Sequence, residues 1–145
     1  MLRLPRLTAA TVITASAAIA LAACSLADGP AALSVGVCLG PIGQAAMLEG
    51  APVIDCGEPH ESEVYASFQL EDGEYPGGQA VAAEAERLCL EAFEEFVGIA
   101  YGDSELLITT MTPIEEAWER QDDREALCLV NDVGDTSGTL QNANR

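Results

Sequence analysis

The single histidine of this chain lies in an acidic segment and is the first candidate for chemistry. Four carboxylates surround His60 in the sequence: Asp55, Glu58, Glu61 and Glu63. An imidazole among carboxylates can hold a metal ion or transfer a proton. However, one histidine without a free thiolate is a poor zinc-binding set, and neither an EF-hand ligand series nor His-Glu-x-x-His is present. We therefore expect no metal, and assign Pro59 to a turn and His60 to a backbone hydrogen bond at the start of a strand.

The sequence offers no arrangement typical of a hydrolase. Gly-x-Ser-x-Gly is missing, and any Ser/His or Cys/His mechanism would depend on His60. Carboxylate pairs carry little information in a chain with 24 acidic residues. One Trp, three Tyr and three Phe are also few for the aromatic cleft of a glycosidase. We expect no catalytic residue and no cofactor.

Trp118 and Arg124 are the remaining candidates for binding, because both residue types are common anchors of protein interfaces. Trp118 lies one helical turn after Ile114, which is the spacing of a buried helix face. Arg124 follows Asp122 and Asp123, with which it can form local ion pairs. Core packing and a local ion pair are the favoured roles, and a partner-binding patch is the alternative.

Cys24 follows a segment with the organisation of a bacterial lipoprotein signal. Arg3 and Arg6 precede an uncharged run from Leu7 to Ala23, and Leu21-Ala22-Ala23-Cys24 resembles a lipobox. We predict removal of residues 1–23 and lipidation of Cys24, whose diacylglycerol would anchor the protein to the outer face of the cell membrane. The alternative is an uncleaved membrane helix, since the run of 17 residues is at the lower limit for a span.

The predicted mature chain of 122 residues fits one domain. Its formal charge is −20, because the two arginines of the signal are removed from a chain of charge −18 and no acidic residue leaves with them. Such a field repels nucleic acid and anionic lipid surfaces. Basic partners and cations remain compatible with it, and a merely solvated acidic surface is the other explanation.

Four cysteines remain beside Cys24, an even number that indicates two disulfides in an exported protein. Three pairings are open from the sequence alone. Cys89 and Cys128 each lie on the apolar face of a predicted element, so we favour Cys89–Cys128 across the core and Cys38–Cys56 around a Gly/Pro-rich segment.

Hydrophobic periodicity predicts short strands and two helices after a linker that covers residues 24–34. The long helix, residues 79–97, has an apolar face and a stop at Gly98. Thr112 and Glu115 form a capping-box pattern that starts a short helix ending near Gln121. The expected strands cover residues 52–55, 63–70, 105–111 and 126–130. This order predicts an α+β domain over residues 35–132, with a mainly antiparallel sheet, followed by a loose polar tail over residues 133–145.

Several motifs together resemble the septum formation domain of cell-envelope proteins from high-GC Gram-positive bacteria. The resemblance covers roughly residues 36–140, with Val37 in place of the acidic residue usual before the first cysteine. Its motifs are Cys56-Gly57-Glu58-Pro59-His60, Glu63-Val64-Tyr65, Tyr75-Pro76-Gly77, Cys89, Thr112-Pro113, Trp118, Arg124 and Cys128. The resemblance implies a link to the division septum, and it brings no agreed reaction, cofactor or catalytic residue.

The sequence therefore predicts a non-catalytic, lipid-anchored interaction or scaffolding module whose partners are envelope or division proteins. An extracytoplasmic lipoprotein that binds a small ligand or a cation is the alternative function.

Overall fold

The computed structural model describes residues 33–41 and 52–145. The predicted signal, the predicted lipidation site at Cys24 and most of the predicted linker lie outside the described residues. Within the described ranges, no helix combines the length and apolar character needed to cross a bilayer.

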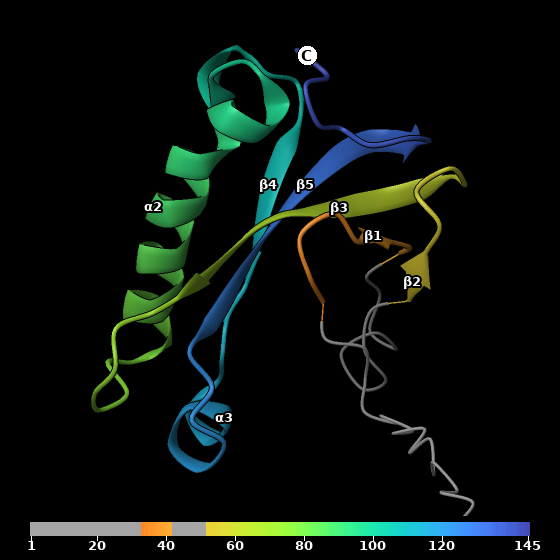
Figure 1. Cartoon of the computed structure of the whole chain (residues 1–145). Helices are drawn as coiled ribbons and strands as arrows, with labels where there is room; N and C mark the ends of the chain where they lie inside the picture. Colours follow the sequence, from red (N-terminus) through yellow and green to blue (C-terminus); the bar gives the residue numbers. More distant parts are fainter. Residues whose placement is uncertain (1–32, 42–51) are drawn as a thin grey trace, which may run out of the picture.

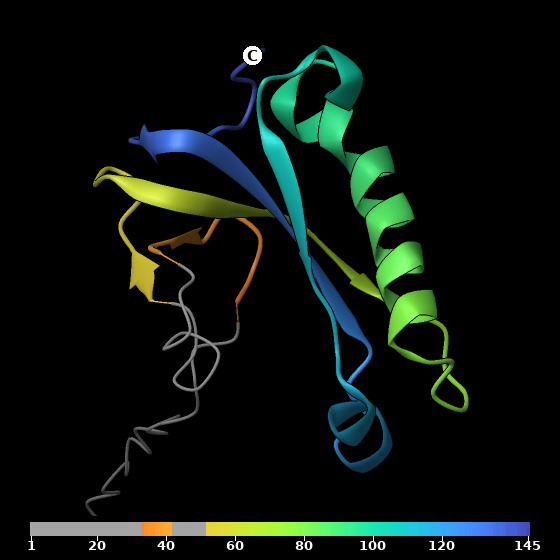
Figure 2. The same ribbon diagram turned by 180° about the vertical axis from the view of Figure 1, so that it is seen from behind.

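A five-stranded sheet, antiparallel at every pairing, forms the centre of the domain. Its order is β2–β1–β3–β5–β4. The strands are β1 (Cys38–Leu39), β2 (Val53–Ile54), β3 (His60–Gln69), β4 (Leu107–Met111) and β5 (Glu125–Thr136). The long helix α2 (Gly78–Val97) lies across one face of the sheet (Figures 1 and 2). The predicted α+β class is confirmed for this part of the chain.

The periodicities of α2 and β5 produce the main core. Val81, Ala85, Cys89, Phe93, Phe96 and Val97 form the buried stripe of α2. In β5, Cys128 and Val130 face this stripe, while Leu127 and Leu129 belong to a cluster with Leu39 and Val64. Both faces of β5 are therefore apolar around Cys128, because an apolar cluster covers each side of the strand there. The helix ends at Gly98, whose left-handed φ of 94° and N–H bond to the Glu94 carbonyl form an αL cap.

A bulge in β3 breaks the regular alternation of its side chains between the two faces of the sheet. Val64 pairs with Leu129 and Ala66 pairs with Cys128, so Tyr65 is an extra residue opposite the continuous β5. The bulge directs Tyr65 and the following apolar residues toward the α2 core, and Val64 to the cluster on the other face. Glu63, on the same strand, is only 2% exposed although it is acidic.

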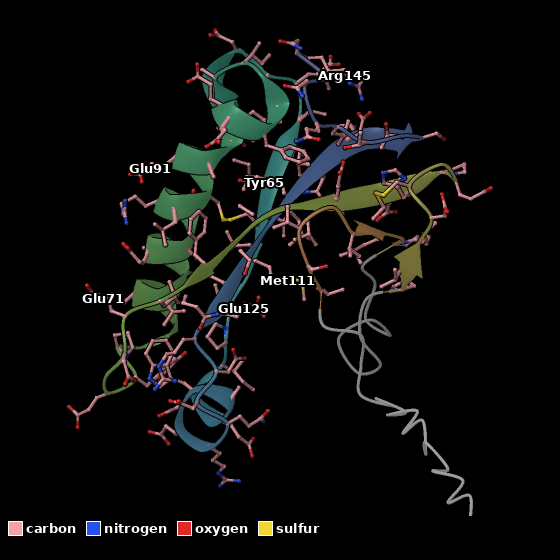
Figure 3. The ribbon with its side chains drawn as sticks, in the orientation of Figure 1. Tyr65, Glu71, Glu91, Met111, Glu125 and Arg145 are labelled. Atoms are coloured by element: carbon pink, nitrogen blue, oxygen red, sulfur yellow. A yellow bond between two sulfur atoms is a disulfide. The ribbon has the colours of Figure 1, made fainter. Side chains whose placement is uncertain are left out.

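Tyr65 joins the sheet to the helix at this bulge, and Figure 3 shows its ring between β3 and α2. Its hydroxyl donates a hydrogen bond of 2.7 Å to the Cys89 carbonyl. Burial raises the pKa of this hydroxyl, so the phenol stays protonated and remains a donor.

Two disulfides connect the elements, and they are the pairings that the sequence favoured. Cys89–Cys128 joins α2 to β5, and both residues are 0% exposed. Cys38–Cys56 joins β1 to the turn before β3, where Cys38 is buried and Cys56 is half-buried.

The expectation of a loose C-terminal tail is wrong. The last strand continues to Thr136, and the segment beyond it packs against the domain. Leu140 is 2% exposed within the α2 core cluster. The backbone N–H groups of Asn142 and Asn144 donate to the carbonyls of Phe96 and Val97, at the end of α2. The C-terminal segment therefore closes the open end of the core.

The start of the short helix α3 (Glu115–Arg120) also differs from the prediction. Ile114 is the N-cap and no side chain caps the helix, so the expected capping box with Thr112 does not form. Ile114 is 66% exposed, and Trp118 packs without it. A short 3₁₀ turn, η1 (Tyr101–Asp103), precedes β4.

Candidate functional site

Trp118 is the centre of a network of polar and aromatic contacts that joins α3 to the β3–α2 connection. Its side chain comes from α3 and is 4% exposed. The indole Nε1–H donates a 2.8 Å hydrogen bond to the Gly73 carbonyl, in the connection between β3 and α2. Tyr75 from the same connection meets the indole edge-on, with 5.7 Å between ring centroids. The buried tryptophan thus has its one polar group satisfied.

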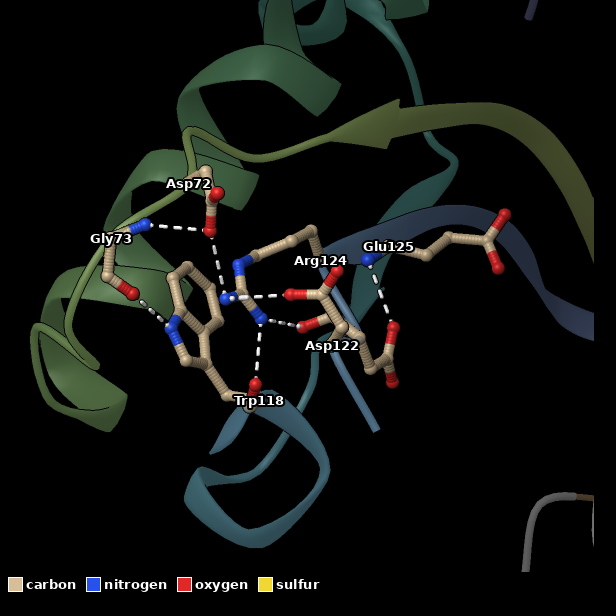
Figure 4. Close-up of polar contacts among 7 residues, drawn as sticks. Asp72, Gly73, Trp118, Asp122, Arg124 and Glu125 are labelled. Carbon is tan, nitrogen blue, oxygen red and sulfur yellow. Dashed lines mark hydrogen bonds and ion pairs between the residues drawn. The ribbon is translucent and has the colours of Figure 1, made fainter. Parts of the chain in front are cut away.

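Arg124, the residue directly before β5, covers the face of this indole. Its guanidinium carbon lies 4.0 Å from the ring centroid, which is a cation–π contact (Figure 4). Nη1 donates to the carbonyls of Trp118, at 2.8 Å, and Asp123, at 2.9 Å. Nη2 contacts the carboxylates of Asp72 at 2.9 Å and Asp122 at 3.1 Å. The planar fork of arginine serves several acceptors at once, which a lysine could not reproduce.

We call this arrangement of Trp118, Arg124 and Gly73 the Trp–Arg clamp. It joins α3 and the residues just before β5, which are neighbours in the sequence, to the β3–α2 connection, which lies about 45 residues earlier. The Leu70 N–H also donates to the Arg124 carbonyl at 2.9 Å, so backbone and side chain hold the same segments together. The hydrogen bond from Arg124 is the main cause that lowers the pKa of the Asp72 carboxyl, although that carboxyl is exposed.

An open hollow of about 530 Å³ lies beside the clamp. Its lining residues come from the three joined segments: Gly73, Glu74, Tyr75, Glu115, Trp118, Glu119, Asp122 and Arg124. Four of them are carboxylates, and the single cation, Arg124, already contacts Asp72 and Asp122. The hollow therefore presents excess negative charge around a half-buried tyrosine ring, and it suits a cationic group. We call it the acidic pocket.

The other predicted candidate, His60, lies on β3 beside the Cys38–Cys56 disulfide. His60 is 1% exposed, and its Nδ1 lies 2.9 Å from the Glu58 carbonyl oxygen. It thus makes the backbone hydrogen bond that the sequence analysis assigned to it. Glu63 is buried nearby and accepts hydrogen bonds from the Thr139 hydroxyl and the Leu140 N–H, both at 2.7 Å.

The sequence pointed to Trp118 and Arg124 but not to their contact. The structure buries Trp118 and pairs Arg124 with Asp122, which are the roles that the sequence favoured. It also stacks the two side chains, which no local pattern indicated. Gly73 and Asp72 were missed as partners because they are far away in sequence, and a turn signal was all that their Asp-Gly pair provided.

Comparison with models of known protein families gives a match over most of the described chain. The family model described as "Septum formation" matches residues 35–145. The match extends over the C-terminal segment that packs against α2 and Glu63. No curated protein and no solved structure gave a match.

Proposed function

The chain belongs to the septum formation family, and we propose that it serves septum formation as a lipid-anchored interaction module on the outer face of the cell membrane. In this proposal Cys24 carries the lipid, and the acidic pocket is the surface that contacts a partner protein of the envelope or division machinery. The module acts by binding and does not catalyse a reaction.

The main support for the proposal is that the contacts of the Trp–Arg clamp join the three segments that line the acidic pocket. Arg124 and Trp118 fix the three segments to each other, so the backbone positions that carry the pocket carboxylates are set before any partner arrives. Preorganised groups lose less conformational entropy on binding. Glu115 and Glu119 are exposed on one face of α3, with Glu74 on the facing connection.

The charge of the pocket indicates the chemistry of the partner. A lysine or arginine side chain of a partner could place its charge among the rim carboxylates and its methylene groups against the Tyr75 ring. Complementary charge would also speed the encounter with a basic segment. We therefore propose a basic segment of an envelope or division protein as the bound element.

A small cationic ligand is the second candidate, because a hollow of about 530 Å³ lies within the size range of small-molecule sites. His60 supports neither an acid–base nor a nucleophilic role in this proposal, since its 1% exposure keeps the imidazole away from any substrate in solution.

Photocrosslinking in living cells tests the proposal. Benzoylphenylalanine in place of Glu74 should capture an envelope or division protein, and Glu115→Lys/Glu119→Lys should abolish the capture. The matched control is Glu94→Lys/Glu95→Lys, which reverses the same number of charges on an exposed part of α2 away from the pocket. Equal capture by the pocket variant and the control would exclude the pocket as the contact surface. Saturable stabilisation of the purified domain by a small cation, without protein capture, would favour the ligand-binding alternative.

A further inference from the structure

A second cluster, on β1 and β3, has the composition of a metal site that is closed by a disulfide. One potential ligand atom each from Cys38, His60 and Glu63 lies within 4.8 Å of the other two. The three side chains are 1%, 1% and 2% exposed. Cys38 pairs directly with Glu63 across the two strands, so the backbone ladder sets their proximity.

The imidazole of His60 has the hydrogen-bonding arrangement that is typical of metal-binding histidines. A carbonyl can only accept, so the 2.9 Å contact between Nδ1 and the Glu58 carbonyl places a proton on Nδ1. In the neutral ring, Nε2 then carries a free lone pair. This atom is buried and has no hydrogen-bond partner among the described residues. Metal-binding histidines usually donate their other ring N–H to a carbonyl or carboxylate in this way.

Hydrogen bonds also fix the carboxylate of Glu63. The Thr139 hydroxyl and the Leu140 N–H donate to its two oxygens, one each, at 2.7 Å. Each oxygen retains a further lone pair, so the carboxylate can bind a cation without losing either bond. The C-terminal segment therefore positions a ligand, in addition to closing the core.

The sulfur of Cys38 is the missing ligand while the disulfide exists. A disulfide sulfur lacks the charge of the thiolate that binds metals. We propose that reduction of Cys38–Cys56 opens a zinc site formed by Cys38 Sγ, His60 Nε2 and the Glu63 carboxylate, with Cys56 Sγ as the fourth ligand. Thiolate, imidazole and carboxylate are the ligand types that zinc takes in proteins.

The reaction needs two electrons from a dithiol. The dithiol breaks the Cys38–Cys56 bond, becomes a disulfide itself, and leaves two protein thiols. Zinc binding then releases the two thiol protons to solvent. Cys56 is half-buried, whereas Cys89 and Cys128 are both 0% exposed, so a reductant reaches Cys38–Cys56 first.

The three clustered side chains, Cys38, His60 and Glu63, need only a small contraction to reach zinc-binding distances. Zinc–ligand bonds of about 2.0–2.3 Å in a tetrahedron separate ligand atoms by about 3.3–3.8 Å. The present separations, at most 4.8 Å, must therefore shorten by about 1 to 1.5 Å at most. The two-residue strand β1 and the turn that carries Cys56 can supply this movement once the disulfide no longer joins them.

Cys56→Ser tests the site without a reductant, because it leaves Cys38 as a permanent thiol. This variant should bind one Zn²⁺ in competition with a chromogenic chelator. With Co²⁺ it should show thiolate charge-transfer absorption and the visible bands of tetrahedral coordination. Adding His60→Ala should weaken zinc binding about tenfold or more. The oxidised wild-type protein should show none of these signals.

Wild-type protein treated with a water-soluble phosphine provides the second measurement if Cys56→Ser folds poorly. The phosphine becomes its oxide as the disulfide is reduced, and it is removed before metal is added. Alkylation and mass spectrometry should find two free thiols, with Cys89–Cys128 intact. Absence of metal binding in folded, reduced protein would overturn the proposal, and so would metal binding that His60→Ala leaves unchanged.

Discussion

The disulfide between α2 and β5 should contribute several kcal/mol to the stability of the domain. Cys89 and Cys128 are separated by 39 residues. A loop of that length gives about 4 kcal/mol in the chain-entropy model at 25 °C. Both side chains are fully buried, so Cys89→Ala/Cys128→Ala should also lose packing in the core. We expect a loss of about 4 kcal/mol or more, close to the total stability of many small domains.

Urea denaturation at 25 °C and thermal melting, both followed by circular dichroism, measure this loss. The melting temperature should fall by about 15 °C, at about 4 °C per kcal/mol for a domain of this size. Cys38→Ala/Cys56→Ala is the matched control, because its separation of 18 residues predicts about 3 kcal/mol in the same model. A loss below about 1 kcal/mol for the α2–β5 variant, or a larger loss for the control, would refute this reasoning.

Three further predictions concern the clamp and the C-terminal segment. Arg124→Ala should lower the free energy of unfolding by about 2 kcal/mol and shift the fluorescence of Trp118, because the cation–π contact and the hydrogen bonds to carbonyls are lost. The stability of Arg124→Lys should lie between that of Arg124→Ala and that of the wild type. Unchanged Trp118 fluorescence in Arg124→Ala would contradict the stacking. Because Asp72 has a pKa below its usual 3.8, its contribution exists above that value and is lost as the pH falls through the lower folded pKa. Urea denaturation of Asp72→Asn should therefore show a weaker loss of stability below about pH 4 than wild type, and identical acid dependence would argue against the ion pair. Removal of residues 139–145 should lower the free energy of unfolding by about 3 kcal/mol, because Leu140 leaves the core and Glu63 loses both of its hydrogen-bond donors. If the truncated protein were as stable in urea as the full chain, the segment would not be part of the domain.

Local hydrophobic periodicity was sufficient to predict a helix or strand wherever the side-chain pattern of that segment alone determines its structure. The apolar spacing of the long helix predicted α2 to within a residue, and the alternation around Cys128 predicted the inward face of β5. Those two predictions also favoured the observed cysteine pairing, because a bridge between facing elements must join residues on their buried faces.

The features that the sequence did not predict depend on contacts between distant residues. The bulge at Tyr65 is a mismatch between two strands, so the pattern of β3 alone contains no sign of it. Leu140 is an isolated large apolar residue in a polar segment, which gives no periodicity, and its partner Glu63 is 77 positions away. The stacking of Arg124 on Trp118 likewise depends on the β3–α2 connection that supplies Gly73 and Asp72.

The most direct test of the proposed function is fluorescence imaging of dividing cells in which the chain carries an export-competent fluorophore in the linker after Cys24. That position leaves the packed C-terminal segment unmodified. We expect enrichment at midcell for the wild-type chain and for the control variant Glu94→Lys/Glu95→Lys. The pocket variant Glu115→Lys/Glu119→Lys should lose this enrichment. Cys24→Ala should lose the membrane anchor. An even distribution of the wild-type chain around the envelope, or midcell enrichment that persists when the charge of the acidic pocket is reversed, would contradict the account.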